Sequence, residues 1–270
     1  MPRIVEPEWL ASKLGSPGLK IIDLRPQPEY NTGHIPGSLS LNVESFRGNI
    51  GGVPSLLLPA DLLAAHFSLL GLNPSDTIVL VFGEKFHDAT LAGMAFERLG
   101  HMDYAIMNGG YAKWAQENRP ADTVLPTVNT SNYPLKREAD HFTVDFRTVA
   151  TKLGKPGTII IDVRPADFYT GKKSDEARAG HIPGAINRPY TEDIITGSNK
   201  VVSLKPIEVL ATEYRKIIAS KDTEVIVHCR TGHQASQTFF VLKRLLGYSK
   251  VRWYDAGWTE WAARTELPLS

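Results

Sequence analysis

Cys229 is the only cysteine in the chain and the residue best suited to covalent chemistry. It follows a short apolar run, residues 225–227, and precedes a helical pattern, so it is expected in a loop between a buried strand and a helix start. The backbone N–H groups of such a loop, together with the helix N-terminus, favour a negative charge. We therefore expect a thiol with a lowered pKa beside an anion-binding site.

The residues around the cysteine distinguish a reactive thiol from a buried apolar one. A lone cysteine is commonly a small buried hydrophobe. Here His228, Arg230 and His233 surround it with polar and cationic groups, which an apolar core does not accommodate. The flanking residues favour a reactive cysteine.

Composition narrows the function classes. The 270 residues are enough for two ordinary domains, and 42% of them are apolar. A net charge of +1, from 30 basic and 29 acidic residues, predicts neither a nucleic-acid nor a membrane partner. One cysteine permits no internal disulfide, and the histidines form no ligand pair, so we expect no metal and no cofactor.

The N-terminus lacks a signal-peptide pattern, which predicts a cytoplasmic protein. We also expect a monomer.

An internal repeat organises the chain. Residues 21–26, IIDLRP, recur at 160–165 as IIDVRP, and residues 33–38, GHIPGS, recur at 180–185 as GHIPGA. A late NGGYAKW at 108–114 corresponds to DAGWTEW at 255–261. The second copy carries an insertion at 171–178, and its basic residues Lys172, Lys173 and Arg178 are expected on a solvated loop. The repeat predicts two domains, residues 1–125 and 141–270, joined by a linker at 126–140.

Strands alternate with helices in each copy. Apolar strands are predicted at 20–24, 77–82, 158–163 and 224–228, and the main helices at 59–70, 89–99, 206–219 and 235–245. This alternation indicates an α/β fold in which each domain is a mainly parallel sheet flanked by helices on both faces. Functional residues of such sheets lie at the carboxyl ends of strands, where Arg164 and Cys229 fall.

The repeat also assigns the chemistry to one copy. Aligning residues 77–82 with 223–228 places Gly83 opposite Cys229. The first copy then lacks a nucleophile, and Glu84 and Asp88 in its loop would repel an anion. We expect the first domain to be inactive and the second to be catalytic.

Together these motifs resemble the rhodanese family of sulfurtransferases in its tandem two-domain form, over nearly the whole chain. The resemblance rests on the Asp-x-Arg strand end, the Gly-His-Ile-Pro-Gly turn, the six-residue cysteine loop and the terminal Gly-Trp-x-x-Trp. It implies two tandem rhodanese-like domains and a ping-pong transfer of sulfane sulfur through a persulfide on Cys229. The implied partners are a small anionic sulfur donor and an acceptor such as cyanide or a thiol.

The resemblance also suggests the residues that bind the donor. The amides of the cysteine loop would hold the sulfur as an anion, and Arg164 matches a family residue that binds the anionic end of the donor. Arg164 could equally form a structural salt bridge, and both interpretations stay open. The substrate-binding set is thus Arg164 with Arg230, Thr231, Gly232, His233, Gln234 and Ala235.

The loop sequence favours thiosulfate as the donor. By resemblance, thiosulfate-type enzymes carry Cys-Arg-Lys-Gly and 3-mercaptopyruvate-type enzymes carry Cys-Gly-Ser-Gly. This chain has Cys-Arg-Thr-Gly, so Arg230 points to thiosulfate while Thr231 lacks the lysine charge. The alternatives are a 3-mercaptopyruvate sulfurtransferase and a persulfide carrier that serves a protein partner. A cysteine phosphatase would need an arginine where Ala235 stands.

Overall fold

The computed structural model describes residues 1–135 and 139–270, and the chain divides into two compact units. The first unit comprises residues 1–47, 57–140 and 196–203, and the second comprises 48–56, 141–195 and 204–270. Of the expected linker, residues 136–138 lie outside the described residues. Its described part contains no helix or strand, although Tyr133 within it is buried and 2.8 Å from the ring of His101.

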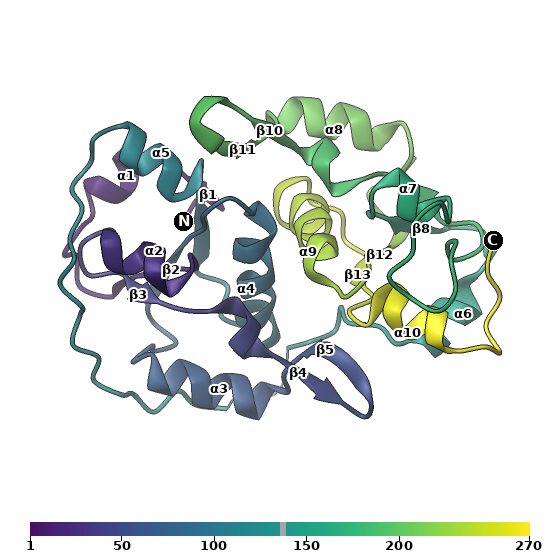
Figure 1. Cartoon of the computed structure of the whole chain (residues 1–270), viewed down its shortest axis with the longest axis horizontal. Coiled ribbons are helices and arrows are strands. Elements are labelled where there is room, and N and C mark those ends of the chain that lie inside the picture. Colours follow the sequence, from purple (N-terminus) through teal and green to yellow (C-terminus); the bar gives the residue numbers. More distant parts are fainter. Residues whose placement is uncertain (136–138) are drawn as a thin grey trace. The chain divides into compact units, whose positions relative to one another are not determined.

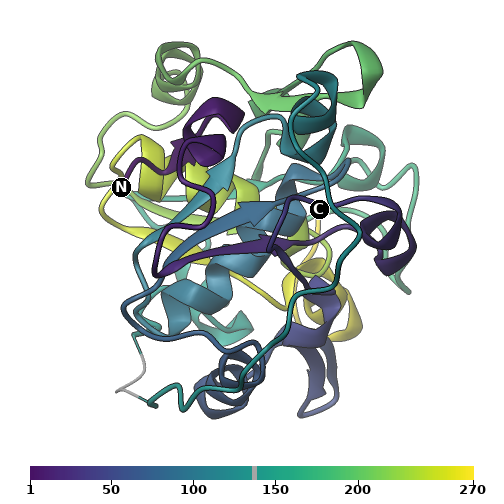
Figure 2. The ribbon, with the colours of Figure 1, turned by 90° about the vertical axis from the view of Figure 1, so that its left-hand side faces the viewer.

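The first unit is built on a five-stranded parallel sheet in the order β1-β7-β6-β2-β3 (Figures 1 and 2). Its strands are β1 (Ile4–Val5), β2 (Leu19–Asp23), β3 (Leu39–Ser40), β6 (Thr77–Val81) and β7 (Tyr104–Met107). Its helices are α1 (Pro7–Ala11), α2 (Gln27–Thr32), η1 (Val43–Phe46), α3 (Ala60–Leu69), α4 (Phe86–Arg98) and α5 (Gly110–Gln116).

The second unit repeats the plan with a four-stranded parallel sheet in the order β13-β12-β8-β9 (Figure 1). Its strands are β8 (Thr158–Asp162), β9 (Ile186–Asn187), β12 (Glu224–His228) and β13 (Val251–Trp253). Its helices are α6 (Phe146–Lys152), α7 (Ala166–Tyr169), η2 (Tyr190–Asp193), α8 (Ile207–Arg215), α9 (His233–Phe240), a π-helical turn η4 (Val241–Leu245) and α10 (Gly257–Ala263).

Two short hairpins were not predicted from the sequence. They are β4 (Arg47–Ile50) with β5 (Val53–Leu57), and β10 (Ile194–Thr196) with β11 (Val202–Leu204), with a 3-10 turn η3 (Ser198–Lys200) between the latter two strands. Neither hairpin has an alternating apolar pattern long enough to mark it as a strand pair. No helix within the described residues is long and apolar enough to cross a membrane.

Helices cover both faces of each sheet, as predicted. In the second unit, Ile160 and Ile226 on one face pack with Val149 of α6 and Trp261 of α10. The alternate strand residues face α9, because successive side chains of a strand point to opposite sides. In the first unit, α1 and α5 pack on one face and α4 contacts β6 and β7. The main predicted elements are therefore confirmed, with ends that differ by a few residues.

Candidate active site

Cys229 directly follows β12 in the second unit, at the carboxyl end of the sheet. Three backbone N–H groups, of Thr231, Gln234 and Ala235, donate to its sulfur. Gln234 and Ala235 belong to the first turn of α9, whose N–H groups have no partner within the helix. The loop and the helix start therefore converge on one sulfur atom, as the sequence indicated.

The pKa of this thiol is raised, and the expectation of a lowered pKa was wrong. Burial is the largest cause, because only 1% of the residue is exposed. The three amide donors lower the pKa without overcoming burial, and the negative charge of Asp162 raises it further. The resting Cys229 is consequently protonated at neutral pH, and sulfur transfer requires its proton to leave.

Gly232 gives the loop its path. It adopts a left-handed backbone with φ of +80° just before α9. A Cβ at this position would lie 2.2 Å from Oδ1 of Asp255, so no other residue fits without movement. The Gly232 carbonyl also accepts a 3.0 Å hydrogen bond from Nε1 of Trp253, which fixes the loop against β13.

His228 is a core histidine rather than an acid or base for the cysteine. It is fully buried, and its Nδ1 lies 3.1 Å from the carbonyl oxygen of Cys229, which can only accept a hydrogen bond. Its Nε2 lies 3.7 Å from Oδ2 of Asp162 and has no hydrogen-bond partner among the described residues. Burial lowers the pKa of His228 although Asp162 opposes this, so the ring is neutral.

Arg164 forms the salt bridge that the sequence left open. Its Nε and Nη2 donate to the carboxylate of Asp162, with the Nη2–Oδ2 distance at 2.6 Å, and Nη2 also donates to the carbonyl of Gly180 at 2.8 Å. Its guanidinium stacks 4.6 Å above the ring of Trp258. Nη1 makes no hydrogen bond within the described residues, so Arg164 is anchored on one edge and open on the other.

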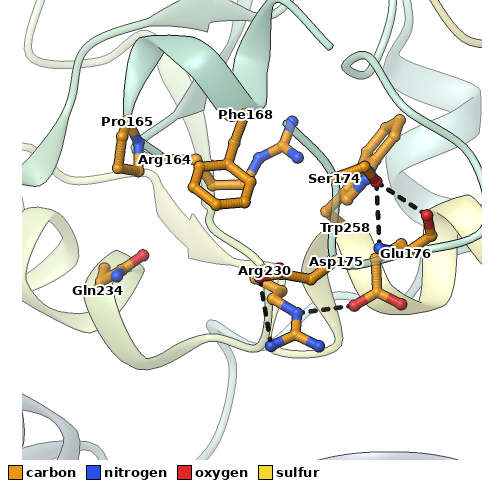
Figure 3. Close-up of a pocket in the computed structure, with 9 residues that line it drawn as sticks. All are labelled: Arg164, Pro165, Phe168, Ser174, Asp175, Glu176, Arg230, Gln234 and Trp258. Carbon is orange, nitrogen blue, oxygen red and sulfur yellow. Dashed lines mark hydrogen bonds and ion pairs between the residues drawn. The ribbon is translucent and has the colours of Figure 1, made fainter. Parts of the chain in front are cut away.

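A pocket of about 120 Å³ lies beside the cysteine loop (Figure 3). It is lined by residues that follow β8 and β12, by the 171–178 insertion and by α10, namely Arg164, Pro165, Phe168, Ser174, Asp175, Glu176, Arg230, Gln234 and Trp258. Cys229 is not among the lining residues, but Arg230 and Gln234 of its own loop are. The geometry offers a small cavity with two guanidinium groups and two aromatic rings next to a buried thiol.

The insertion brings acidic groups to this pocket. Nε of Arg230 donates to Oε1 of Glu176 at 2.8 Å, and its Nη1 lies 3.7 Å from Oδ2 of Asp175 (Figure 3). Arg178 instead donates to backbone carbonyls of Trp261, Ala262, Arg264 and Leu267, at 2.5–2.9 Å. Of the three basic residues expected on a solvated loop, Lys172 and Lys173 are exposed as predicted, whereas Arg178 is partly buried.

The predicted site residues have different relations to the pocket. Arg164, Arg230 and Gln234 line it, whereas Thr231 and Ala235 contribute backbone N–H groups to the sulfur. His233 turns its Nδ1 toward Thr231, 3.0 Å from the carbonyl and 3.2 Å from Oγ1. Six further residues line the pocket and were not predicted from the sequence: Pro165, Phe168, Ser174, Asp175, Glu176 and Trp258. The Gly-Trp motif and the position of the insertion beside the turn were the sequence features that could have indicated these pocket residues.

The first unit has a different residue at the cysteine position from the one expected. The N–H of Leu24 donates to Val81, as that of Val163 donates to His228, and the N–H of Tyr111 donates to Phe82, as that of Trp258 donates to Cys229. Phe82, not Gly83, is therefore equivalent to Cys229, and the sequence alignment was wrong by one residue. The shift arose because Thr77 was matched with Thr223, whereas the strand pairing makes Thr77 equivalent to Glu224.

Comparison with known proteins identifies the repeated unit. A model of the rhodanese-like domain matches residues 6–117 and again residues 146–264. A putative thiosulfate sulfurtransferase of Synechococcus elongatus is 33% identical over 99% of this chain and 84% of its own length. A thiosulfate sulfurtransferase of Corynebacterium glutamicum is 31% identical over 99% and 90%, and the sulfur carrier protein TtuD of Thermus thermophilus is 30% identical over 99% and 96%.

Solved structures share the fold at lower identity. The crystal structure of YnjE superposes with a TM-score of 0.84 at 19% identity, over 99% of this chain and 68% of that one. The anaerobic ergothioneine biosynthesis enzyme of Chlorobium limicola, in complex with trimethyl histidine, gives 0.81 at 21% identity, over 99% and 70%. With both domains matched and the parallel sheets in place, this chain belongs to the rhodanese family.

Proposed function

We propose that this protein is a thiosulfate sulfurtransferase that carries sulfane sulfur as a persulfide on Cys229. The observation that carries the proposal is the convergence of three backbone N–H groups on the Cys229 sulfur, beside a pocket that contains Arg164 and Arg230. Amide donors stabilise a negative sulfur without a metal or a cofactor. The thiosulfate sulfurtransferases among the relatives support the same activity.

The first half-reaction transfers one sulfur atom. The sulfur of Cys229 attacks the outer sulfur of thiosulfate, a new S–S bond forms, and the S–S bond of the donor breaks with its electron pair going to sulfite. Because the thiol is protonated at rest, its proton must leave during this step, and the departing sulfite can accept it. The products are the Cys229 persulfide anion, held by the loop amides, and hydrogen sulfite.

The second half-reaction regenerates the enzyme. A thiolate or cyanide attacks the outer sulfur of the persulfide, the Cys229 sulfur leaves as a thiolate, and it regains a proton. In this scheme the first domain is inactive, because Phe82 occupies the position of the nucleophile.

A persulfide carrier is the second candidate function. The relative named sulfur carrier protein favours it, and the burial of Cys229 would protect a persulfide from adventitious thiols. 3-Mercaptopyruvate is the alternative donor, and Arg230 disfavours it because the cysteine loop of 3-mercaptopyruvate-type enzymes carries a glycine at this position.

Intact mass spectrometry tests the proposal. The protein is incubated with thiosulfate, or separately with 3-mercaptopyruvate, beside a Cys229→Ser control. We expect the wild type to gain one sulfur atom from thiosulfate and to lose it to cyanide, while the control gains none. A gain from 3-mercaptopyruvate alone would reassign the donor. No gain from either, with the thiol free and reduced, would overturn the enzyme assignment.

A further inference from the structure

The insertion at 171–178 exists only in the second copy, and it brings two carboxylates to the pocket of Cys229. Asp175 is about half exposed, with 53% of its side chain accessible, whereas Glu176 is mostly covered, with 15% accessible. Both face the guanidinium of Arg230 (Figure 3). The residue that would attract an anionic donor is thus already paired with acids from the same domain.

Glu176 is held in this position from three sides. Its Oε1 accepts a 2.8 Å hydrogen bond from Arg230 and a 2.6 Å hydrogen bond from Oγ1 of Thr259. Its backbone N–H donates to Oγ of Ser174 at 3.1 Å, and its carbonyl accepts from the same hydroxyl at 2.9 Å. A carboxylate fixed by this many contacts is a built feature of the pocket rather than a passing surface contact.

The charges at the pocket therefore do not favour an anion, because two guanidinium groups face three carboxylates. Arg164 is compensated by Asp162, and Arg230 by Glu176 and Asp175. A dianion such as thiosulfate must compete with Glu176 for Arg230 and approach two carboxylates. A molecule with an ammonium group is instead attracted by the carboxylates, because Asp175 remains accessible to it.

We propose that Glu176, with Asp175, determines the charge preference of the pocket, lowering its affinity for dianionic donors and favouring sulfur acceptors that are small thiols bearing an ammonium group. This inference rests on the proposed function, since the acceptor thiolate must attack the outer sulfur of the Cys229 persulfide. The ammonium of the acceptor would lie against Asp175 and Glu176, with its thiolate directed to the sulfur. Glu176 is then a specificity-determining residue of the second half-reaction.

Three thiols of similar size and different charge test the proposal. Cysteamine is cationic, 2-mercaptoethanol is neutral and mercaptoacetate is anionic. The persulfide is formed first, and its loss to each thiol is followed by intact mass in the wild type and in Glu176→Gln. Taking the ratio of variant to wild-type rate for each thiol cancels the intrinsic nucleophilicity of the thiols. Glutamine keeps an oxygen that can accept from Arg230 and Thr259 while removing the charge.

We expect Glu176→Gln to react about fivefold more slowly with cysteamine and about fivefold faster with mercaptoacetate, with 2-mercaptoethanol unchanged. The kcat/KM for thiosulfate should rise by a similar factor. Glu266→Gln is the matched control, because it removes the same charge from an exposed carboxylate of the same domain that does not line the pocket. Equal ratios for all three thiols in Glu176→Gln, as in the control, would overturn the proposal.

A second readout separates this inference from the sulfurtransferase assignment. Iodoacetate and iodoacetamide alkylate the single cysteine and differ in charge, so their rate ratio at Cys229 reports the charge of the pocket without any sulfur transfer. Glu176→Gln should raise the iodoacetate-to-iodoacetamide ratio about fivefold and Glu266→Gln should not. If the wild type gains no sulfur from thiosulfate while this ratio shifts, the donor assignment fails and the charge preference stands. An unchanged iodoacetate-to-iodoacetamide ratio in Glu176→Gln, with normal sulfur transfer, would overturn the proposed charge preference and leave the sulfurtransferase assignment in place.

Discussion

The two domains carry the same salt bridge at the end of the same strand, although only one of them has a cysteine beside it. Nη2 of Arg25 lies 2.7 Å from Oδ2 of Asp23, and Nη2 of Arg164 lies 2.6 Å from Oδ2 of Asp162. Each arginine also donates to the carbonyl of the turn glycine at 2.8 Å. A contact that a domain without a nucleophile preserves in this detail is a requirement of the fold.

The His-Ile-Pro turns lead to the same conclusion. His34 stacks on Tyr30 with ring centroids 3.9 Å apart, and His181 stacks on Tyr169 at 3.8 Å. In both turns Nδ1 of the histidine lies 2.9 Å from the tyrosine carbonyl. The turn histidines therefore fix the loop in both domains.

The domains differ where the chemistry would take place. Cys229 is replaced by Phe82, which is fully buried and packs edge-on against Phe86 at 5.2 Å. Gly232 has Lys85 at the equivalent place, three residues further on, with an ordinary φ of −110°. The first loop thus lacks the left-handed turn that aims the amides of the second loop at one sulfur.

The largest effect is expected from moving the cysteine between the domains. Cys229→Ser should lower sulfur transfer to the background rate, a loss of at least about 10³-fold. Adding Phe82→Cys to that variant should restore nothing, because the first loop lacks the turn of Gly232 and contains acidic residues. Intact mass after thiosulfate measures both variants. A persulfide on the relocated cysteine would show that the loops are equivalent and that only the nucleophile separates the domains.

The next prediction concerns the shared salt bridge. Asp23→Asn and Asp162→Asn each leave a buried arginine without its charged partner, and each should lower the free energy of unfolding by about 3 kcal/mol. Urea titration followed by tryptophan fluorescence measures the loss. The protein that remains folded in Asp23→Asn should keep the wild-type kcat. If Asp162→Asn abolished sulfur transfer without any loss of stability, the pair in the second domain would have a direct part in the reaction.

Most of the fold could be predicted from the sequence, because the same motifs occur in both copies and each copy predicts the same strands and turns. The Asp-x-Arg and His-Ile-Pro segments mark strand ends and turns. Local hydrogen bonds fix the backbone geometry of these strand ends and turns, so they can be predicted without knowledge of the tertiary structure. The position of Cys229 after β12 followed from the same local pattern. The hairpins and the exact strand alignment depend on pairing between distant segments, and no local signal reports them.

The electrostatics of the site were harder to predict. The pKa of the thiol results from the opposing effects of burial and hydrogen bonding, and residue types reveal the donors but not that Cys229 is only 1% exposed. Likewise the insertion was judged on its lysines, whereas Glu176 and Asp175 are the residues that reach the pocket. Composition shows which charges a loop carries, but only the structure shows which of these side chains reach the pocket.

The pH dependence of the thiol should reflect its burial. Because the pKa of Cys229 is raised and the thiolate is the nucleophile, alkylation by iodoacetamide should accelerate about tenfold per pH unit across neutral pH. It should continue to rise beyond about pH 8.5, where an ordinary cysteine levels off. Asp162→Asn should move the profile to lower pH, since the Asp162 charge raises this pKa. A plateau below about pH 7 would mean that the amide donors outweigh burial.

The smallest effect is expected from a substitution that adds one positive charge to the cysteine loop, the loop that distinguishes the two domains. Thr231 contributes a backbone N–H to the Cys229 sulfur, and that contact does not depend on its side chain. Thr231→Lys should therefore keep the loop while adding a cation near the sulfur, which favours both the thiolate and a dianionic donor. We expect the KM for thiosulfate to fall about threefold, because the charge is partly exposed and screened. The same substitution at the exposed Thr191, which does not line the pocket, is the control and should leave KM unchanged. An unchanged KM in Thr231→Lys would mean that the pairing of Arg230 with Glu176, rather than the missing lysine, limits donor affinity, because an added cation would then be neutralised by the same carboxylates.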